Sequence, residues 1–254
     1  MSTQVIAFAN QKGGVAKTTT CLSLGGCLAE MGKAVLLIDL DPQASLTLSL
    51  GIDPRSLRRT VADSILHNAT LVSVSRETAV PGLEIVPAGP GLATIDKVLY
   101  RGQGYETYLK EALDVVRDGL YDYVLIDCAP AFGPLTLNAL TACDLLIVPV
   151  QAEYYSVRSL DNVFELIELT RQKTNPALRY RLLVTMFDRR NSVCVKILER
   201  MRTRFPHVLL ETVIEVDTRL RESPIVSKPI TLYKPDTRGA QQYRALAEEL
   251  LRYE

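Results

Sequence analysis

Two lysines and two glycines near the start of the chain carry its strongest chemical signal. They lie in V-I-A-F-A-N-Q-K-G-G-V-A-K-T-T-T, residues 5–20. The pattern predicts a short buried strand, a tight turn at Gly13 and Gly14, and a helix that opens at Lys17. Such a turn lets backbone N–H groups converge, and the positive end of the helix dipole favours an anion. Lys17 adds a charge for the outer phosphates of a nucleotide, and the Thr18 hydroxyl can ligate its magnesium ion.

The spacing differs from the strict P-loop pattern G-x-x-x-x-G-K-[ST], because Gln11 and Ala16 stand where that pattern has glycine. The form that fits is K-G-G-x-x-K-[ST], with Lys12 at its start. It resembles the deviant Walker A ATPases, the group of the ParA partition proteins, the MinD division-site proteins and the nitrogenase iron protein. Most of that group have glycine at the position of Ala16. Alanine fits there without strain only at negative φ, which is therefore the expectation. A chance Gly-Gly turn between a strand and a helix is the alternative.

A second candidate site follows the apolar run of residues 34–39, which is typical of a parallel strand buried on both faces. Asp39 ends the run, and D-L-D-P-Q continues with Asp41. Two carboxylates at this spacing can point into one site, one toward a metal-bound water and the other toward the water that attacks the γ-phosphate. The alternative is an Asp-Pro turn with solvated acids. The D-x-D-P-Q pattern is more similar to ParA than to MinD.

A third carboxylate, Asp127, ends the apolar run of residues 123–127. A buried strand that ends in an acid is the Walker B arrangement, in which the carboxylate reaches the magnesium shell through water. The alternative is an aspartate that only caps a strand end. Cys128 follows, where the family usually has a Pro-Pro pair. We interpret this cysteine as a small core thiol rather than an iron–sulfur ligand.

Composition sets wide bounds. A chain of 254 residues with 47% hydrophobic residues can form one large α/β domain or two small ones. The formal net charge is zero, so overall charge indicates no partner. Five cysteines without a C-x-x-C pair favour a reducing cytosol over a disulfide framework or zinc site. The sequence shows no secretory leader pattern and no apolar run long enough to span a membrane.

Periodicity predicts further elements. Helices are expected over 18–31, 60–66 and 105–116, in a stretch that runs to about 172 with Leu160, Val163, Phe164 and Ile167 on one face, and from about 239. Strands are expected over 83–86, 145–150 and 181–187. Thr60 and Asp63 have the spacing of a capping pair. By resemblance, Q-A-E after the strand of residues 145–150 matches the V-Q-x-E of ParA proteins. Also by resemblance, Met186 and Asp188 fall where the family contacts adenine.

Residues 171–204 contain ten Lys or Arg and two acids, although the whole chain is neutral. Such segregation suits a phosphate backbone, and the few aromatic residues favour a duplex over a single strand. A solvated basic helix face is the alternative. By resemblance, Arg190 and Arg219 fall on positions that contribute to DNA binding in chromosomal ParA proteins. Three residues depart from the family near Arg219, and these are Glu215 for proline, Ser223 for alanine and Ser227 for glycine.

The resemblance covers nearly the whole chain and implies a single P-loop NTPase domain over residues 1–254, an α/β fold with a mostly parallel central sheet and helices on both faces. It implies an ATPase that uses ATP and Mg²⁺ to segregate chromosome or plasmid DNA. ATP would join two copies into a homodimer that binds double-stranded DNA without sequence preference, and a ParB-like partner would stimulate hydrolysis and release the DNA. The protein would be cytoplasmic and associated with the nucleoid, without a membrane partner.

The same resemblance assigns roles to individual residues. Thr18, Asp39 and Asp127 would hold magnesium, Asp41 would orient the attacking water, and Lys12 would reach the phosphates of the other subunit. The residues expected to wrap the phosphates form one run, Gly13, Gly14, Val15, Ala16, Lys17, Thr18 and Thr19. A membrane-bound positioning ATPase, a positioning ATPase for protein cargo, and a reductase or cluster carrier are the alternatives.

Overall fold

In the computed structural model, residues 3–66, 69–99, 103–117 and 119–252 are described. Their strands form an eight-stranded sheet in the order β3-β4-β2-β5-β1-β6-β7-β8. Neighbouring strands run parallel except β3 and β4, which pair antiparallel at one edge. The strands are β1 (Gln4–Phe8), β2 (Val35–Leu40), β3 (Arg76–Glu77), β4 (Leu83–Val86), β5 (Tyr123–Cys128), β6 (Leu145–Gln151), β7 (Arg179–Phe187) and β8 (Leu209–Glu215).

The central strands are apolar along their whole length because both faces of the sheet are covered. Along β1, Val5 and Ala7 pack into one hydrophobic core, and Ile6 and Phe8 pack into the other. All four are 0% exposed. Alternation of this kind follows from the two-residue period of a strand. The prediction of an α/β fold with a mostly parallel sheet is confirmed.

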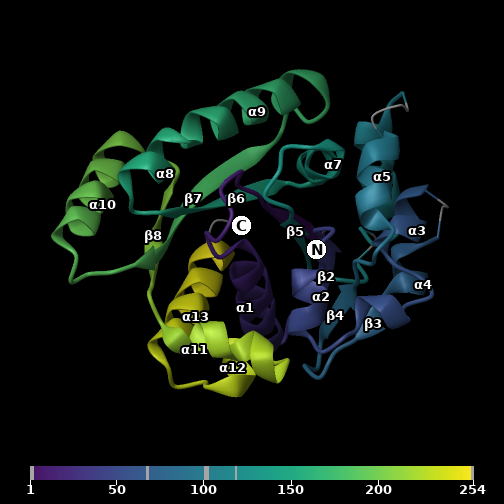
Figure 1. Ribbon diagram of the computed structural model, residues 1–254, viewed down its shortest axis with the longest axis horizontal. Coiled ribbons are helices and arrows are strands. Elements are labelled where there is room, and N and C mark those ends of the chain that lie inside the picture. Colours follow the sequence, from purple (N-terminus) through teal and green to yellow (C-terminus); the bar gives the residue numbers. More distant parts are fainter. Residues whose placement is uncertain (1–2, 67–68, 100–102, 118, 253–254) are drawn as a thin grey trace.

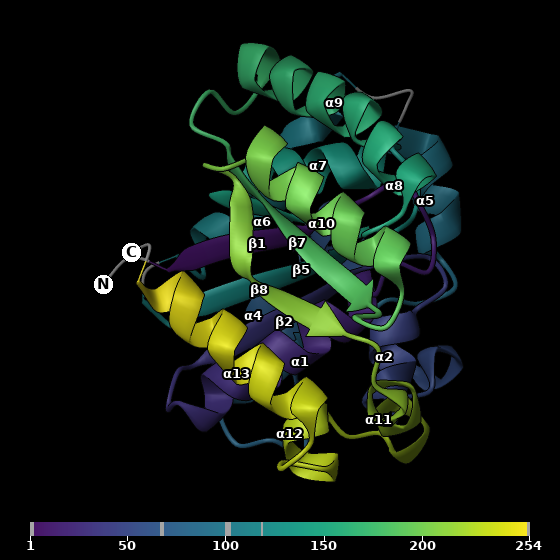
Figure 2. The same ribbon diagram turned by 90° about the vertical axis from the view of Figure 1, so that its left-hand side faces the viewer.

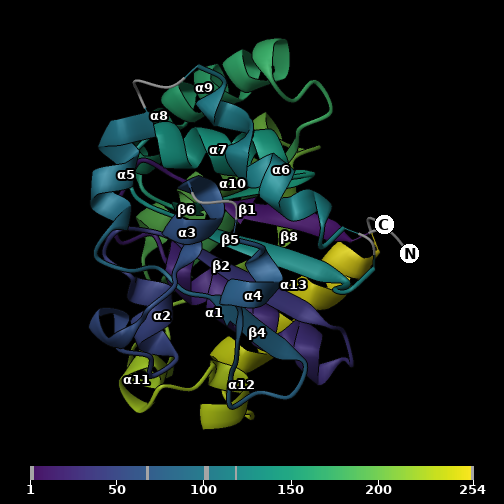
Figure 3. The same cartoon turned by 90° about the vertical axis from the view of Figure 1, so that its right-hand side faces the viewer.

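Helices form a layer on each side of the sheet (Figure 1). One core includes residues of α1 (Lys17–Glu30), α2 (Ser45–Ser49), α11 (Thr218–Glu222), α12 (Ile230–Tyr233) and α13 (Arg238–Leu251). The other includes residues of α3 (Val61–Leu66), α4 (Leu71–Val74), α5 (Leu92–Leu99), α6 (Tyr108–Asp114), α7 (Pro134–Ala142), α9 (Leu160–Lys173) and α10 (Ser192–Arg204). Figure 2 shows α9, α10 and α13 around β7 and β8, and Figure 3 shows α4 beside β4.

The closing helix α13 packs as predicted. Tyr243, Leu246, Ala247 and Leu250 are all buried in the core that α1 also lines. The hydroxyl groups of Tyr243 and Thr20 lie 3.1 Å apart and share a hydrogen bond. Helix α1, which follows the phosphate-binding turn, is therefore held in place by α13.

Several predicted elements have different bounds. The expected helix over residues 105–116 begins as a 3₁₀ turn, η2 (Tyr105–Thr107), before α6. The helix expected to run to about residue 172 is α9, and the short helix α8 (Tyr154–Arg158), which was not predicted, precedes it with Ser159 between them. Strands β3 and β8 were not predicted. β3 has two exposed residues, and β8 has four intermediate positions and one exposed, so neither shows the apolar run of a central strand.

Candidate nucleotide-binding site

The predicted carboxylates meet because the strands that carry them lie side by side. β5 lies between β2 and β1, with Asp39 opposite Asp127 and Phe8 opposite Asp127 in the parallel register. The carboxyl ends of all three strands therefore reach the same edge of the sheet, where ligands of open α/β sheets bind. The phosphate-binding turn follows β1 and lies at this edge.

The amino end of α1 is prepared for an anion. No side chain caps it, and its first turn contains no acidic residue. Its first N–H groups are left for another acceptor, and they add to the positive end of the helix dipole. Thr18 and Thr19, in this first turn, are half-buried, whereas Gly13 and Gly14 in the preceding turn are exposed. Such an end suits a phosphate group.

The expectation of a negative φ at Ala16 is wrong. Ala16 has φ 64° and ψ 32°, the left-handed conformation, directly before α1. A side chain in this conformation costs about 1–2 kcal/mol relative to the right-handed one, and glycine avoids that cost. This conformation explains why a glycine suits the position. Gly14, at φ 72°, also uses this region, and Val15 between them is buried, with its carbonyl accepting from Thr185 Oγ1 at 3.0 Å.

Lys17 lies at the centre of the charged groups. It is 7% exposed, and its Nζ donates to the Lys12 carbonyl oxygen at 3.2 Å. Burial lowers the pKa of Lys17, and attraction to Asp127, Cys128 and Asp41 opposes that shift. A phosphate at this place would add further negative charge and favour the charged form of the lysine.

Asp127 is the carboxylate with the least support from the protein. It is 0% exposed, and among the described residues neither carboxylate oxygen has a hydrogen-bond partner. Burial raises its pKa well above the usual value, and Asp39 adds to the shift. The Thr18 hydroxyl and Lys17 oppose it. Buried polar groups are nearly always partnered, so two orphaned oxygens beside a threonine hydroxyl fit a magnesium ion and its water shell.

Asp39 differs, although it also is 0% exposed. Its Oδ1 accepts from the Asp41 N–H at 3.0 Å, and its Oδ2 accepts from the N–H and hydroxyl of Thr47 at 2.9 and 2.7 Å. Burial raises its pKa to about 6, and these hydrogen bonds limit the shift. Its lone pairs are largely used inside the protein. Asp39 therefore orients the Asp41 segment, and a part in the magnesium shell stays a prediction.

Asp41 stands at the mouth of the site, 8% exposed. Its Oδ1 accepts from the Gln43 N–H at 2.9 Å, so the turn of D-L-D-P-Q holds the side chain in place. The alternative of solvated acids is wrong for Asp39 and Asp41, because both are buried. Cys128 is 1% exposed and packs in the core, as the sequence indicated.

Lys12 is held within its own chain. Its Nζ donates to Gln151 Oε1 at 2.7 Å, Glu153 Oε2 at 2.8 Å and Ser156 Oγ at 2.8 Å. Three acceptors satisfy all three donors of an ammonium group. Gln151 and Glu153 belong to the segment that the sequence matched to V-Q-x-E, but no role could be assigned to them. The structure shows that they surround the signature lysine.

Met186 and Asp188 both lie at the end of β7, but in different surroundings. Met186 has φ 52°, and its Sδ accepts from Gln151 Nε2 at 3.1 Å. Asp188 pairs with Arg190, whose Nε lies 3.1 Å from Asp188 Oδ1. Hydrogen bonds from Arg190 lower the pKa of Asp188. A residue expected at adenine and a residue expected at DNA thus form one ion pair.

Two supporting residues gave no sequence signal that we used. Thr47 links the site to β4, since its hydroxyl accepts from the Ala88 N–H at 3.0 Å while donating to Asp39. Asn10 orders the phosphate-binding turn by donating to the Pro149 carbonyl at 2.7 Å and accepting from the Lys12 N–H at 3.0 Å. Asn10 follows the end of β1 and Thr47 lies in α2, and small polar residues are too common in such places to single these two out.

The two DNA-binding candidates lie on neighbouring segments. The Val216 N–H donates to the Phe187 carbonyl at 3.0 Å, which joins the chain before Arg219 to the chain before Arg190. Arg219 pairs with Glu222 at 2.8 Å. Surface pairs of this kind contribute little and exchange readily for another anion.

The departure at Glu215 has a structural explanation. Its carboxylate pairs with Arg189 at 3.3 Å and Arg238 at 3.0 Å, and its N–H donates to Gln242 Oε1 at 2.9 Å. Proline could not donate that bond. Ser223 is buried, and Ser227 has φ 55°, a conformation that favours glycine.

Helix α10 carries much of the basic segment. Lys196, Arg200 and Arg204 recur every four residues on its exposed side, and Leu198 and Met201 face the core. The three cations, with Glu199 and Thr203, line a shallow surface hollow of about 490 Å³. A row of this kind matches the spacing of one helix face.

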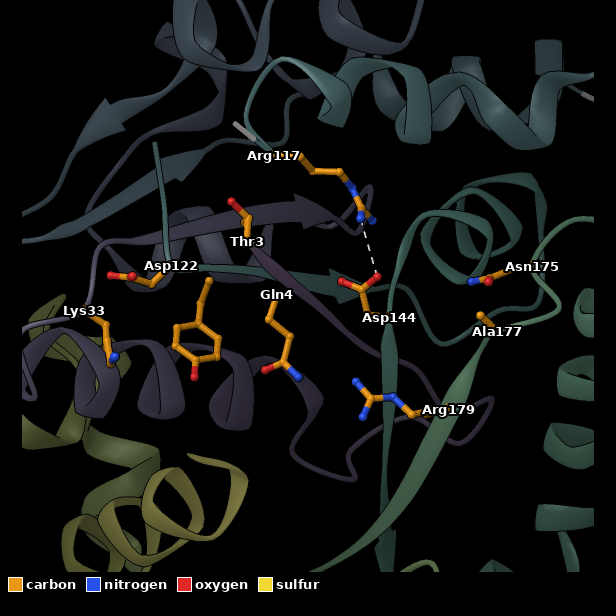
Figure 4. A pocket seen from close by; sticks show the side chains of 10 residues that line it. Thr3, Gln4, Lys33, Arg117, Asp122, Asp144, Asn175, Ala177 and Arg179 are labelled. Atoms are coloured by element: carbon orange, nitrogen blue, oxygen red, sulfur yellow. Dashed lines mark hydrogen bonds and ion pairs between the residues drawn. The ribbon is translucent and has the colours of Figure 1, made fainter. Parts of the chain in front are cut away.

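A separate cavity of about 750 Å³ lies at the opposite edge of the sheet, where the parallel strands begin (Figure 4). Its lining includes Lys33, Arg117 and Arg179. None of the residues predicted for the nucleotide site lines it. The site for the nucleotide is therefore defined by the strand ends and α1, and this cavity is distinct from it.

Comparison with known proteins agrees with this geometry. Residues 3–180 match the family described as AAA domain. The sporulation initiation inhibitor protein Soj of Bacillus subtilis is 40% identical over 97% of this chain and 98% of its own length. The chromosome partitioning protein ParA of Caulobacter vibrioides is 39% identical over 98% of this chain and 94% of its own.

Solved structures give the same result. A Mycobacterium smegmatis protein described as cobyrinic acid a,c-diamide synthase has a TM-score of 0.86 and 38% identity, covering 99% of this chain and 95% of its own. It was crystallised with ADP and magnesium, and also with an ATP analogue and magnesium. The fold and the site thus define a P-loop nucleotide-binding protein of the AAA domain class. Within that class, the chain belongs to the Soj and ParA family of partition ATPases.

Among the described residues, the helices are too short or too polar to cross a membrane.

Proposed function

We propose that the protein is an ATP-dependent DNA-partition ATPase, a single domain over residues 1–254 that acts in the cytoplasm on the nucleoid. The observation that supports this most is Asp127, buried with both oxygens unpartnered among the described residues, beside Lys17 and the uncapped end of α1. These groups suit the phosphates of ATP and a magnesium ion. Magnesium, when bound, neutralises charge on the phosphates.

The chain's own residues supply the remaining parts of hydrolysis. The backbone from Gly13 to Thr19 binds the phosphates, with Lys17 as the internal cation. Asp41, fixed through Gln43 and Asp39, orients the attacking water. Positioning and charge stabilisation are what phosphoryl transfer requires.

Dimer formation uses Lys12 from the other subunit. In the structure this lysine is bound by Gln151, Glu153 and Ser156 of its own chain. It would leave those acceptors to contact the phosphates in trans, comparable in role to an arginine finger. ATP would then hold two copies face to face.

The dimer would bind non-specific double-stranded DNA through two copies of the basic surface, defined here as Arg190, Arg219 and the exposed cations of α10. Two weak sites joined in one particle bind a polymer much more tightly than either alone. A ParB-like protein would stimulate hydrolysis and so release the DNA. No membrane partner is proposed.

The test measures duplex binding of the Asp41→Ala protein with ATP across a salt series. Arg219→Ala should weaken binding and reduce the slope of log K against log salt by about one for each phosphate that the variant no longer neutralises. Lys33→Ala, a cation at the opposite edge of the sheet, is the matched control and should leave the slope unchanged. Equal slopes for the parent and Arg219→Ala would show that Arg219 does not contact DNA. Binding that ignores ATP would contradict the proposed function.

A further inference from the structure

Gln151, the last residue of β6, connects three parts of the proposed site. Its Oε1 accepts from Lys12 Nζ at 2.7 Å. Its Nε2 donates to Met186 Sδ at 3.1 Å and to the Gly14 carbonyl oxygen at 3.4 Å. One side chain thus contacts the signature lysine, the phosphate-binding turn and the end of β7.

The partners fix which way the amide points. An ammonium group offers only donors, so it requires the carbonyl side of Gln151. The Met186 sulfur and the Gly14 carbonyl are acceptors, so they require the NH₂ side. The contacts at Met186 and Gly14 therefore hold the amide in the orientation that binds Lys12. Loss of those contacts would leave the amide free to turn.

Met186 is held in a conformation that methionine seldom adopts. Its φ is 52°, and it is half-buried at a strand end. The neighbouring Thr185 is paired in register with Gln151 and donates to the Val15 carbonyl. The ends of β6 and β7 and the phosphate-binding turn therefore form one connected unit. If the base lies at the end of β7, as the resemblance implies, it would contact Met186.

We propose that Gln151 is a positioning residue that couples nucleotide occupancy to the release of Lys12. This inference rests on the proposed function, since it assigns the coupling between ATP binding and dimer formation to one side chain. A nucleotide held by the phosphate-binding turn and the end of β7 would shift Gly14 and Met186, and the Gln151 amide would lose the acceptors that orient it. Lys12 then keeps only Glu153 and Ser156 as partners, and exchanges them for the phosphates of a second copy.

The experiment strengthens the contact between Gln151 and Lys12 in one variant and removes the contact between Gln151 and Met186 in another. All proteins carry Asp41→Ala so that ATP persists. The quantity measured is a ratio: the ATP concentration that gives half-maximal dimer in sedimentation, divided by the dissociation constant for ADP in calorimetry. The ratio corrects for any direct effect on nucleotide affinity.

Gln151→Glu places a second carboxylate on Lys12, and a charge-assisted bond is about twice as strong as a neutral one. We expect the ratio to rise about fivefold or more. Met186→Leu removes the sulfur acceptor and loosens the amide, so the ratio should fall. Adding Glu153→Gln to Gln151→Glu restores the local charge and should return the ratio toward that of the parent. Gln172→Glu, exposed on α9, is the control for the charge change, and Met31→Leu is the control for loss of sulfur.

Shifts in the same direction for Gln151→Glu and Met186→Leu, or no shift in either, would overturn the inference while ATP-dependent dimers would still support the proposed function. General damage to the fold would move both ratios in one direction, so it cannot mimic the expected result. A parent protein that forms no dimer with ATP would overturn the dimer step itself, and the inference with it.

Discussion

Asp127, where the parallel strands end, differs from two aspartates where those strands begin. At the edge where the parallel strands begin, Asp122 accepts from the Ala34 N–H, and Asp144 accepts from the Val5 N–H and pairs with Arg117. At the edge where they end, Asp127 is buried with no partner for either oxygen among the described residues, and its pKa is raised. The first pair supports the fold. Asp127 is a carboxylate that the fold does not stabilise, and such groups are often found at ligand sites.

The largest contrast is expected between two lysines, one at each edge. Lys17→Ala removes the internal cation and leaves Asp127 and Asp41 without it, so ADP affinity should fall at least about a hundredfold. Lys33→Ala, beside the opposite cavity, should change ADP affinity less than about twofold. Calorimetric titration with ADP and magnesium measures both. Tight binding by the Lys17 variant would contradict the assignment of the phosphate site.

Asp127→Asn should make the nucleotide-free protein more stable at high pH. The folded pKa of Asp127 is raised, so the folded state binds more protons than the unfolded state above about pH 4, and stability falls as the pH rises toward the folded pKa. The variant lacks that loss. Its advantage in free energy of unfolding should grow as the pH rises above about 4, as measured by urea titrations at a series of pH values.

Burial also raises the pKa of Asp39, to about 6, so Asp39 likewise lowers the stability of the folded protein as the pH rises from the ordinary pKa of an aspartate to about 6. A variant advantage that shrinks as the pH rises would show that Asp127 is partnered in the folded protein.

Asp144, where the parallel strands begin, should matter for stability and not for ADP binding. Asp144→Ala leaves the Val5 N–H of the central strand without its acceptor, which costs about 2 kcal/mol and lowers the melting temperature by roughly 4–8 °C. ADP affinity should change less than about twofold because Asp144 lies before the start of β6, far from the carboxyl ends of the strands where the nucleotide site is. Thermal melts with and without ADP would show the two effects separately. A large loss of ADP affinity in Asp144→Ala would contradict the proposed difference between Asp144 and Asp127.

The smallest expected effect is at Ala16. Ala16→Gly removes the strain of φ 64° and should stabilise the protein by up to about 1 kcal/mol, a rise of about 2–4 °C in melting temperature. The control is Ala29→Gly in the same helix, which should destabilise it by about 1 kcal/mol. A loss of stability in both variants would mean that glycine's flexibility outweighs the strain at Ala16.

Sequence patterns predicted much of this architecture, because the central strands are apolar runs buried on both faces. The same patterns placed Lys17, Asp39, Asp41 and Asp127 at strand and helix ends that converge. They missed β8, whose partly exposed residues lack such a run.

They also missed what surrounds Lys12, since three acceptors from one later segment become its neighbours only when β6 lies beside β1. The prediction of a negative φ at Ala16 was wrong for a local reason. The tight turn before α1 requires a positive φ at this position, and the presence of alanine did not indicate that.

The most direct test of the contrast between the edges is the effect of magnesium on ADP binding in three proteins: the unchanged chain, Asp127→Asn and Asp144→Ala. We expect magnesium to increase ADP affinity about tenfold or more in the unchanged chain and in Asp144→Ala, and to have little effect in Asp127→Asn. Equal magnesium dependence in all three proteins would contradict the account, because the unpartnered carboxylate of Asp127 would then have no part in binding the metal and its nucleotide.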